Sequence, residues 1–257
     1  MNVDDIARVA LAWRPCHRLV ASRFPTVGLY DDIAAPEDLD VVFAIEALTN
    51  PRIRQELGAL SLVAPADRLS GPGATLVMAA FTHLNPEGSR FSDGSYGVYY
   101  AALALETAVA EVSHHRAIFL ARTAEPEIDL DLRRIQAELA ADAAHDIRAS
   151  AVDAAAFAEV YHPQRYAAAQ GLGRRLRQAG AQAIAYDSVR HPGGQCAAVF
   201  LPRLLRKPRP AGHVGLHWDG TRISHWYLKG EPKPLNGEPK PLKGEPKPLA
   251  AIPSIAR

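Results

Sequence analysis

The hydrophobic pattern changes repeatedly along the chain between short strand-like runs and longer helical segments. Short apolar runs, several rich in β-branched or aromatic residues, predict strands at residues 74–81, 96–101, 117–123, 127–132, 182–186 and 195–201. Segments dominated by alanine, leucine and charged residues predict helices at residues 3–13, 37–48, 53–57, 102–115, 133–144 and 163–179. Residues 213–218 and 222–227 predict a closing hairpin around Asp219-Gly220.

Strands and helices do not alternate regularly in this pattern, which is why we predict an α+β fold of short mixed sheets with flanking helices. A Ser-Gly-Pro-Gly turn at residues 70–73 separates the first part of the chain from the rest. We therefore expect an N-terminal helical extension at residues 1–70, packed on a core at residues 71–228.

The last part of the chain, residues 229–257, has a different character. It begins with three seven-residue repeats, KGEPKPL, NGEPKPL and KGEPKPL. Two prolines in each repeat exclude a helix and favour an extended, polyproline-like chain. We interpret this segment as an accessory tail outside the fold, and docking of a partner on it is the alternative.

Composition narrows the classes of protein. The net charge of +1 gives no support for binding to nucleic acid or to an anionic membrane. The two cysteines, Cys16 and Cys196, are far apart, which favours a reducing cytoplasm over a disulfide-stabilised secreted protein. The first residues lack the order of a signal peptide, and no apolar run approaches the ~20 residues that a membrane helix needs. We expect a cytoplasmic protein.

The stretch GSRFSDGSYGVYYAALALETAVAEVSHHR, residues 88–116, concentrates the candidate chemistry. Glu106 and Glu111 lie roughly 140° apart on a helix, so only one of them can face a given cleft. The small neighbours of Glu111 leave more room for a ligand, although both residues can also be plain surface acids. Arg90 precedes a strand and can hold a phosphate through its planar fork of donors, the alternative being an ion pair with Asp93.

Two neighbouring tyrosines complete this stretch. Tyr99 and Tyr100 alternate faces on a strand, which places one in the core and lets the other face a cleft.

The sequence lacks several motifs of other enzyme classes. No phosphate-binding glycine motif is present, and Ser188 lacks the Gly-x-Ser-x-Gly context of a hydrolase nucleophile. The adjacent His114 and His115 diverge on a helix, and the Asp129-x-Asp131 pair lacks a third ligand. We expect no metal.

The same residues resemble the RES-domain family. GSRFSDGSYGVYYAALALETAVAE is similar to the arginine, Tyr-Ala-Ala and glutamate core of that family, and YDSVRHPGGQCAAVF is similar to its serine segment. HRLVASRFP is similar to the basic opening of longer members, so that the resemblance runs from about residue 17 to residue 218. The sequence differs from the compact toxins of that family in three features. It has phenylalanine in place of tryptophan after Arg90, about 70 extra residues before residue 71, and the repeated tail.

The resemblance implies a fold similar to ADP-ribosyltransferases and an enzyme that consumes NAD as its substrate. It implies cleavage of the nicotinamide–ribose bond by a glycohydrolase or phosphorylase, within a toxin–antitoxin pair whose antitoxin is Xre-like. A mono-ADP-ribosyltransferase and an inactive binding module of the same fold are the alternatives. The implied roles are oxocarbenium stabilisation by Glu111, phosphate binding by Arg90 and Arg18, orientation of the nicotinamide ribose by Tyr100, and hydrogen bonding of substrate by Ser188.

Overall fold

The computed structural model describes residues 3–21, 31, 39, 41, 59–230 and 247–248. Its strands form one sheet in the order β1-β2-β5-β4-β3-β6-β7-β8. The strands are β1 (Arg8–Ala21), β2 (Tyr99–Ala102), β3 (Ile128–Asp146), β4 (Ala183–Asp187), β5 (Gln195–Val199), β6 (Leu205–Trp218), β7 (Ile223–Lys229) and β8 (Lys247–Pro248). The helices are α3 (Ala74–Thr82), α4 (Leu105–Thr123) and α5 (Ala167–Gln178), with short 3₁₀ turns at Val3–Asp5, Leu60–Leu62, Pro65–Asp67 and Pro202–Leu204. The predicted α+β class is confirmed.

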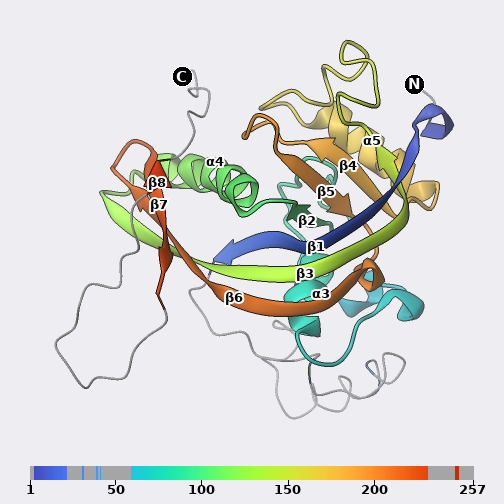
Figure 1. The fold of residues 1–257 in the computed structure, drawn as a ribbon, viewed down its shortest axis with the longest axis horizontal. Helices are drawn as coiled ribbons and strands as arrows, with labels where there is room; N and C mark the ends of the chain where they lie inside the picture. The colour runs from blue at the N-terminus through green and yellow to red at the C-terminus, as the bar shows by residue number, and fades with distance from the viewer. Residues whose placement is uncertain are drawn as a thin grey trace.

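The sheet closes on itself in part, because β1 pairs with β3 as well as with β2. Strands β1, β2, β5, β4 and β3 thereby form a closed circuit, from which β6, β7 and β8 continue outward. Helices α4 and α3 lie on opposite sides of the long β1, β3 and β6 strands, and α5 lies beside β4 (Figure 1). Two buried apolar clusters result: one includes Val109, Leu172 and Trp218, and the other includes Met78 and Tyr99.

The predicted helix at residues 3–13 is wrong, because β1 begins within it. Leu11 and Trp13 are buried while the residues between and beside them are exposed, which is the period-two pattern of a strand. Pro15 lies where the pairing of β1 with β3 shifts register between Trp13 and Cys16, a position that tolerates the missing N–H of proline. The first strand of the sheet therefore comes from the predicted helical extension, and the boundary at residue 70 stays a prediction.

Three further elements differ from the prediction. The apolar run at residues 74–81 is helix α3, and the predicted strand at residues 117–123 continues helix α4. The predicted helix at residues 133–144 is part of β3, which is hydrogen-bonded to β1 on one edge and to β6 on the other. Ile135, Ala137, Leu139 and Ala141 are buried in strict alternation along it, so pairing on both edges outweighs the helix propensity of alanine.

Other predicted elements are confirmed in kind, with shifted ends. The strand predicted at 96–101 is β2, at residues 99–102, and the helix predicted at 102–115 is α4, which begins at Leu105. The helix within 163–179, the strand pair β4 and β5, and the β6–β7 hairpin are also present. The helices predicted at 37–48 and 53–57 lie outside the described residues, apart from Leu39 and Val41. The tail is not wholly outside the fold, because Lys247 and Pro248 pair with β7. Within the described ranges, no helix is both long enough and apolar enough to cross a membrane.

Candidate active site

Glu111 lies in the second turn of helix α4 and is tied to the loop that follows β4. The hydroxyl of Ser188 donates a hydrogen bond to Glu111 Oε1 at 2.6 Å. The same hydroxyl oxygen accepts the backbone N–H groups of Arg190 at 3.1 Å and His191 at 2.9 Å. A hydroxyl has one proton and two lone pairs, and all three are engaged here. Ser188 therefore fixes one carboxylate oxygen of Glu111 and has no free valence for another partner.

The Ser188 loop is itself held against helix α4. His191 Nδ1 lies 2.9 Å from the Thr107 hydroxyl, and Thr107 is one helical turn before Glu111. A Cβ atom at Gly194 would lie only 2.6 Å from the same Thr107 hydroxyl, so only glycine allows this approach. The carboxylate of Glu111 is consequently oriented by contacts on both sides of the loop.

Arg90 supplies a buried cation from the loop between α3 and β2. Its Nη1 donates to the carbonyls of Val160 at 3.0 Å and His162 at 3.2 Å, and its guanidinium lies 4.8 Å from the centre of the Tyr166 ring. Only 7% of the residue is exposed. The alternative ion pair between Arg90 and Asp93 does not form, since Asp93 pairs with Arg174 at 2.6 Å.

Arg18 brings a second cation from β1, far away in the sequence. Its Nη1 donates to the carbonyl of Tyr100 at 3.3 Å, and its guanidinium lies 4.7 Å from the centre of the Tyr99 ring. Burial lowers the pKa of Arg18 from its ordinary value, while the nearby tyrosines oppose this shift. Within the described ranges neither Arg18 nor Arg90 has a carboxylate at ion-pair distance, so both charges are available to an anion.

Tyr99 and Tyr100 occupy opposite faces of β2, as predicted. Tyr99 is fully buried, whereas Tyr100 is partly exposed. The Tyr100 hydroxyl accepts the N–H of Phe91 at 2.9 Å and shares a hydrogen bond of 2.7 Å with the Ser89 hydroxyl. Burial raises the pKa of Tyr100 to about 12, so the phenol is neutral at neutral pH. Its hydroxyl therefore clamps the two residues on either side of Arg90.

These side chains meet at one cavity of about 190 Å³. Glu111, Arg90, Tyr100 and Arg18 all line it, and Ser188 lies directly behind Glu111. The structure thus brings together all five residues that the sequence suggested as a site. One half-buried carboxylate that shares a cavity with two cations suits a ligand that is anionic in one part and electron-poor in another.

Sequence reasoning missed several residues of this cavity, including His17, Tyr166, Tyr186 and Cys196. His17 adjoins Arg18, but a single histidine in a basic segment gives no signal of its own. Burial lowers the pKa of His17, and Arg134 lowers it further, so its imidazole is neutral at neutral pH.

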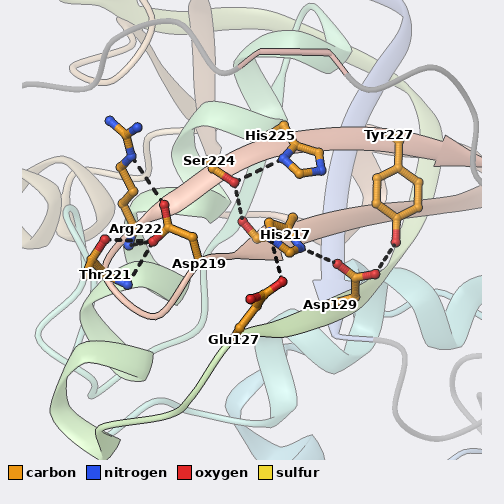
Figure 2. Close-up of polar contacts among 9 residues, drawn as sticks. All are labelled: Glu127, Asp129, His217, Asp219, Thr221, Arg222, Ser224, His225 and Tyr227. Atoms are coloured by element: carbon orange, nitrogen blue, oxygen red, sulfur yellow. Dashed lines mark hydrogen bonds and ion pairs between the residues drawn. The ribbon is translucent and has the colours of Figure 1, made fainter.

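The Asp129-x-Asp131 pair lies at the start of β3, and Asp129 belongs to a different cluster, formed with side chains of the adjacent β6–β7 hairpin (Figure 2). Asp129 lies 2.8 Å from His217 Nδ1 and accepts the Tyr227 hydroxyl at 3.1 Å, and Asp131 pairs with Lys229. His217 stacks on His225 with ring centres 4.5 Å apart. Both carboxylates thus serve cross-strand pairing. In the part of the chain that the structure describes, no group of three or more His, Cys, Asp or Glu side chains is arranged to hold a metal ion.

Comparison with known proteins identifies the family. A sequence model of the RES domain matches residues 65–219, more than half of the chain. The chain belongs to the RES-domain family. This RES-domain protein is also 38% identical over 120 residues to the uncharacterized protein y4oC of Sinorhizobium fredii (strain NBRC 101917 / NGR234), and the match spans 47% of this chain and 51% of that relative. The chain therefore matches only about half the length of its curated relative.

Among solved structures, the RES-domain chain is similar to one in the crystal structure of the M. tuberculosis MbcT–MbcA toxin–antitoxin complex. The match has 11% sequence identity and a TM-score of 0.44, and it covers 81% of this chain and 89% of the other. The predicted family is confirmed by the RES-domain match, which includes Arg90, Tyr100, Glu111 and Ser188 but begins after Arg18.

Proposed function

We propose that this RES-domain protein cleaves the bond between nicotinamide and ribose in NAD, as a glycohydrolase or a phosphorylase. One observation carries the proposal: an oriented carboxylate, Glu111, shares a cavity with two guanidinium groups that have no carboxylate partner among the described residues. NAD combines a cationic nicotinamide riboside with an anionic pyrophosphate. It therefore needs both kinds of charge within one site.

The chemistry requires little more than these charges. When the bond breaks, its electron pair leaves with nicotinamide, whose ring nitrogen becomes neutral, so that no general acid has to protonate the leaving group. The ribose carbon is left with oxocarbenium character, as in glycoside cleavage. Glu111 stabilises that positive charge and orients the incoming nucleophile. Water or phosphate then forms the new bond to this carbon, and the proton released by water passes to solvent.

Arg90 and Arg18 bind the pyrophosphate in this proposal. The two carbonyl contacts of Arg90 Nη1 fix its guanidinium plane while its remaining donors stay available for phosphate oxygens. Tyr100 contributes its ring and not its hydroxyl, because that hydroxyl is committed to Ser89 and Phe91. In this proposal the ring, which lines the cavity, lies against the nicotinamide ribose.

For Ser188 we propose a different role from the one that the resemblance implied. Its hydroxyl is saturated by Glu111 and by two backbone N–H groups. We therefore assign Ser188 to the positioning of Glu111 instead of a direct hydrogen bond to substrate. The same geometry keeps Glu111 pointing into the cavity before substrate arrives, which is the preorganisation that electrostatic catalysis requires.

At the biological level, we propose the toxin of a toxin–antitoxin pair, inhibited by an Xre-like partner, on the basis of the family resemblance. The decisive test of the chemistry is incubation of purified protein with NAD, with and without phosphate, and chromatography of the products. Free ADP-ribose identifies a glycohydrolase, a phosphorylated ADP-ribose a phosphorylase, and labelled protein a transferase. Absence of nicotinamide identifies a binding module and refutes the proposed enzyme.

A matched pair of variants tests the residue assignment. Glu111→Gln keeps the size of the side chain and removes its charge, and we expect a loss of about 10²–10³-fold or more in nicotinamide release. Glu106→Gln makes the same change five residues earlier on α4, at an exposed position outside the cavity, and should leave the rate unchanged. Full activity of the Glu111→Gln protein would show that the carboxylate has another purpose.

A further inference from the structure

A second cavity adjoins the Glu111 cavity, between helix α3 and the loop that precedes β2. It encloses about 410 Å³, compared with about 190 Å³ for the Glu111 cavity. Arg18, Ser89 and Tyr100 line both cavities. These three residues therefore form a wall that the two cavities share.

The volumes show that the Glu111 cavity alone is too small for a dinucleotide. Sites for drug-sized ligands span roughly 300–1,000 Å³, and NAD is at least as large as such ligands. The Glu111 cavity lies below that range, whereas the two cavities together fall within it. If the nicotinamide ribose lies at Glu111, the rest of the molecule has to extend beyond this cavity, and the second cavity is the neighbouring space that shares Arg18 with it.

The lining of the second cavity fits an aromatic base with polar edges. Its apolar members include Val20, Leu76, Ala79 and Val98, and its polar members include His83, Asn85 and Ser92. Small and branched apolar side chains can contact the faces of a ring system, and a few polar groups can hydrogen-bond its edges and so fix the orientation of the ligand. No lysine, aspartate or glutamate and no arginine other than Arg18 is among the described lining residues, so the body of this cavity suits an uncharged group.

The wall of the second cavity is already formed without a ligand. The Tyr96 hydroxyl donates to the Phe91 carbonyl at 2.6 Å, and the Ser92 hydroxyl donates to the Tyr96 carbonyl at 2.6 Å. Gly97 lies directly on helix α3, where a Cβ atom would come within 2.3 Å of Phe81 Cα. A preformed wall costs little ordering entropy when a ligand binds.

We propose that this second cavity binds the adenosine half of NAD, with the pyrophosphate held by Arg18, which lines both cavities. The inference rests on the proposed function for the identity of the ligand, although the cavity and its lining stand independently. In this arrangement the Glu111 cavity selects the reacting ribose and the α3 cavity selects the nucleotide attached to it.

The test uses two halves of NAD as probes, AMP and nicotinamide mononucleotide, and a variant that fills the second cavity. Ala79 lies on α3, is partly exposed, and lines only that cavity, so Ala79→Trp blocks it without touching Glu111 or the arginines. Ala168→Trp on α5, at an exposed position outside both cavities, is the matched control. Melting curves by circular dichroism verify folding, and Ala79→Leu replaces Ala79→Trp if the larger side chain prevents it.

Calorimetry should show AMP binding to the wild type and to Ala168→Trp, and at least about tenfold weaker binding to Ala79→Trp. The affinity for nicotinamide mononucleotide should be the same in all three proteins. No AMP binding to the wild type, or equal AMP affinity in Ala79→Trp, overturns the inference. Nicotinamide release from NAD is scored separately: release without AMP binding refutes only the adenosine site, and AMP binding blocked by Ala79→Trp without any release refutes only the proposed reaction.

Discussion

Replacing Ser188 by alanine distinguishes a residue that orients the catalytic carboxylate from one that binds substrate. The wild-type hydroxyl holds Glu111 Oε1 at 2.6 Å and is itself held by the N–H groups of Arg190 and His191. Without it, Glu111 loses the contact that fixes its rotamer, and the two N–H groups lose their acceptor. Substrate loses no contact, because Ser188 had no hydrogen-bonding valence left to offer.

The size of the effect follows from the kind of hydrogen bond that is lost. A hydrogen bond to a charged group contributes about 1.5–3 kcal/mol. If that free energy is expressed only when Glu111 meets the developing cation, kcat falls by about 10- to 100-fold. KM for NAD should stay within about twofold, since ground-state binding is carried by Arg18 and Arg90 in this scheme.

Steady-state kinetics of nicotinamide release measure both parameters. Ser188→Thr keeps a hydroxyl at the same place and should recover most of the lost kcat, while Ser150→Ala, at an exposed serine outside the cavity, should change nothing. A Ser188→Ala protein with normal kcat and a strongly raised KM would refute the reasoning, because that result belongs to a serine that binds substrate directly.

Two further predictions concern stability. Gly97→Ala should destabilise the fold by about 1–3 kcal/mol in urea unfolding, because its Cβ would lie 2.4 Å from the Ala80 carbonyl oxygen; an unchanged midpoint would contradict this. Burial and nearby Arg190 lower the pKa of His114 from 6.5 to about 3. Between these two pH values His114 is protonated in the unfolded chain and neutral in the folded chain. The wild type should therefore lose stability as pH falls through this window, and a folded His114→Gln variant should lose less; identical pH slopes would contradict the assignment.

Several elements were predictable because local pattern and tertiary environment agree. Helix α4 follows from an alanine- and leucine-rich run without proline or glycine, and the β6–β7 hairpin follows from the Asp-Gly turn at residues 219–220. The position of Glu111 on the more open face of α4 follows from helical geometry, whereas Glu106 is exposed. In these segments the local sequence pattern is sufficient to predict the secondary structure.

The wrong predictions share one physical reason. Residues 74–81 are apolar apart from Thr75. Such a short apolar run is compatible with a buried strand or a buried helix, so the tertiary contacts around it determine which one forms. Residues 133–144 favour a helix by propensity, yet they pair along both edges as part of β3. Strand β1 could not be predicted from its local sequence for the same reason, because its partners β2 and β3 lie far away in the sequence.

The sequence by itself determined which residue types are present for the chemistry, and the spacing that places an arginine, a tyrosine and a glutamate within one loop, strand and helix. Only the tertiary structure decided what each side chain touches. It brought Arg18 from β1 to the backbone carbonyl of Tyr100, turned the Ser188 hydroxyl toward Glu111, and placed Arg18 in the lining of two cavities. Such contacts depend on pairing between distant strands, which no local pattern of residues records.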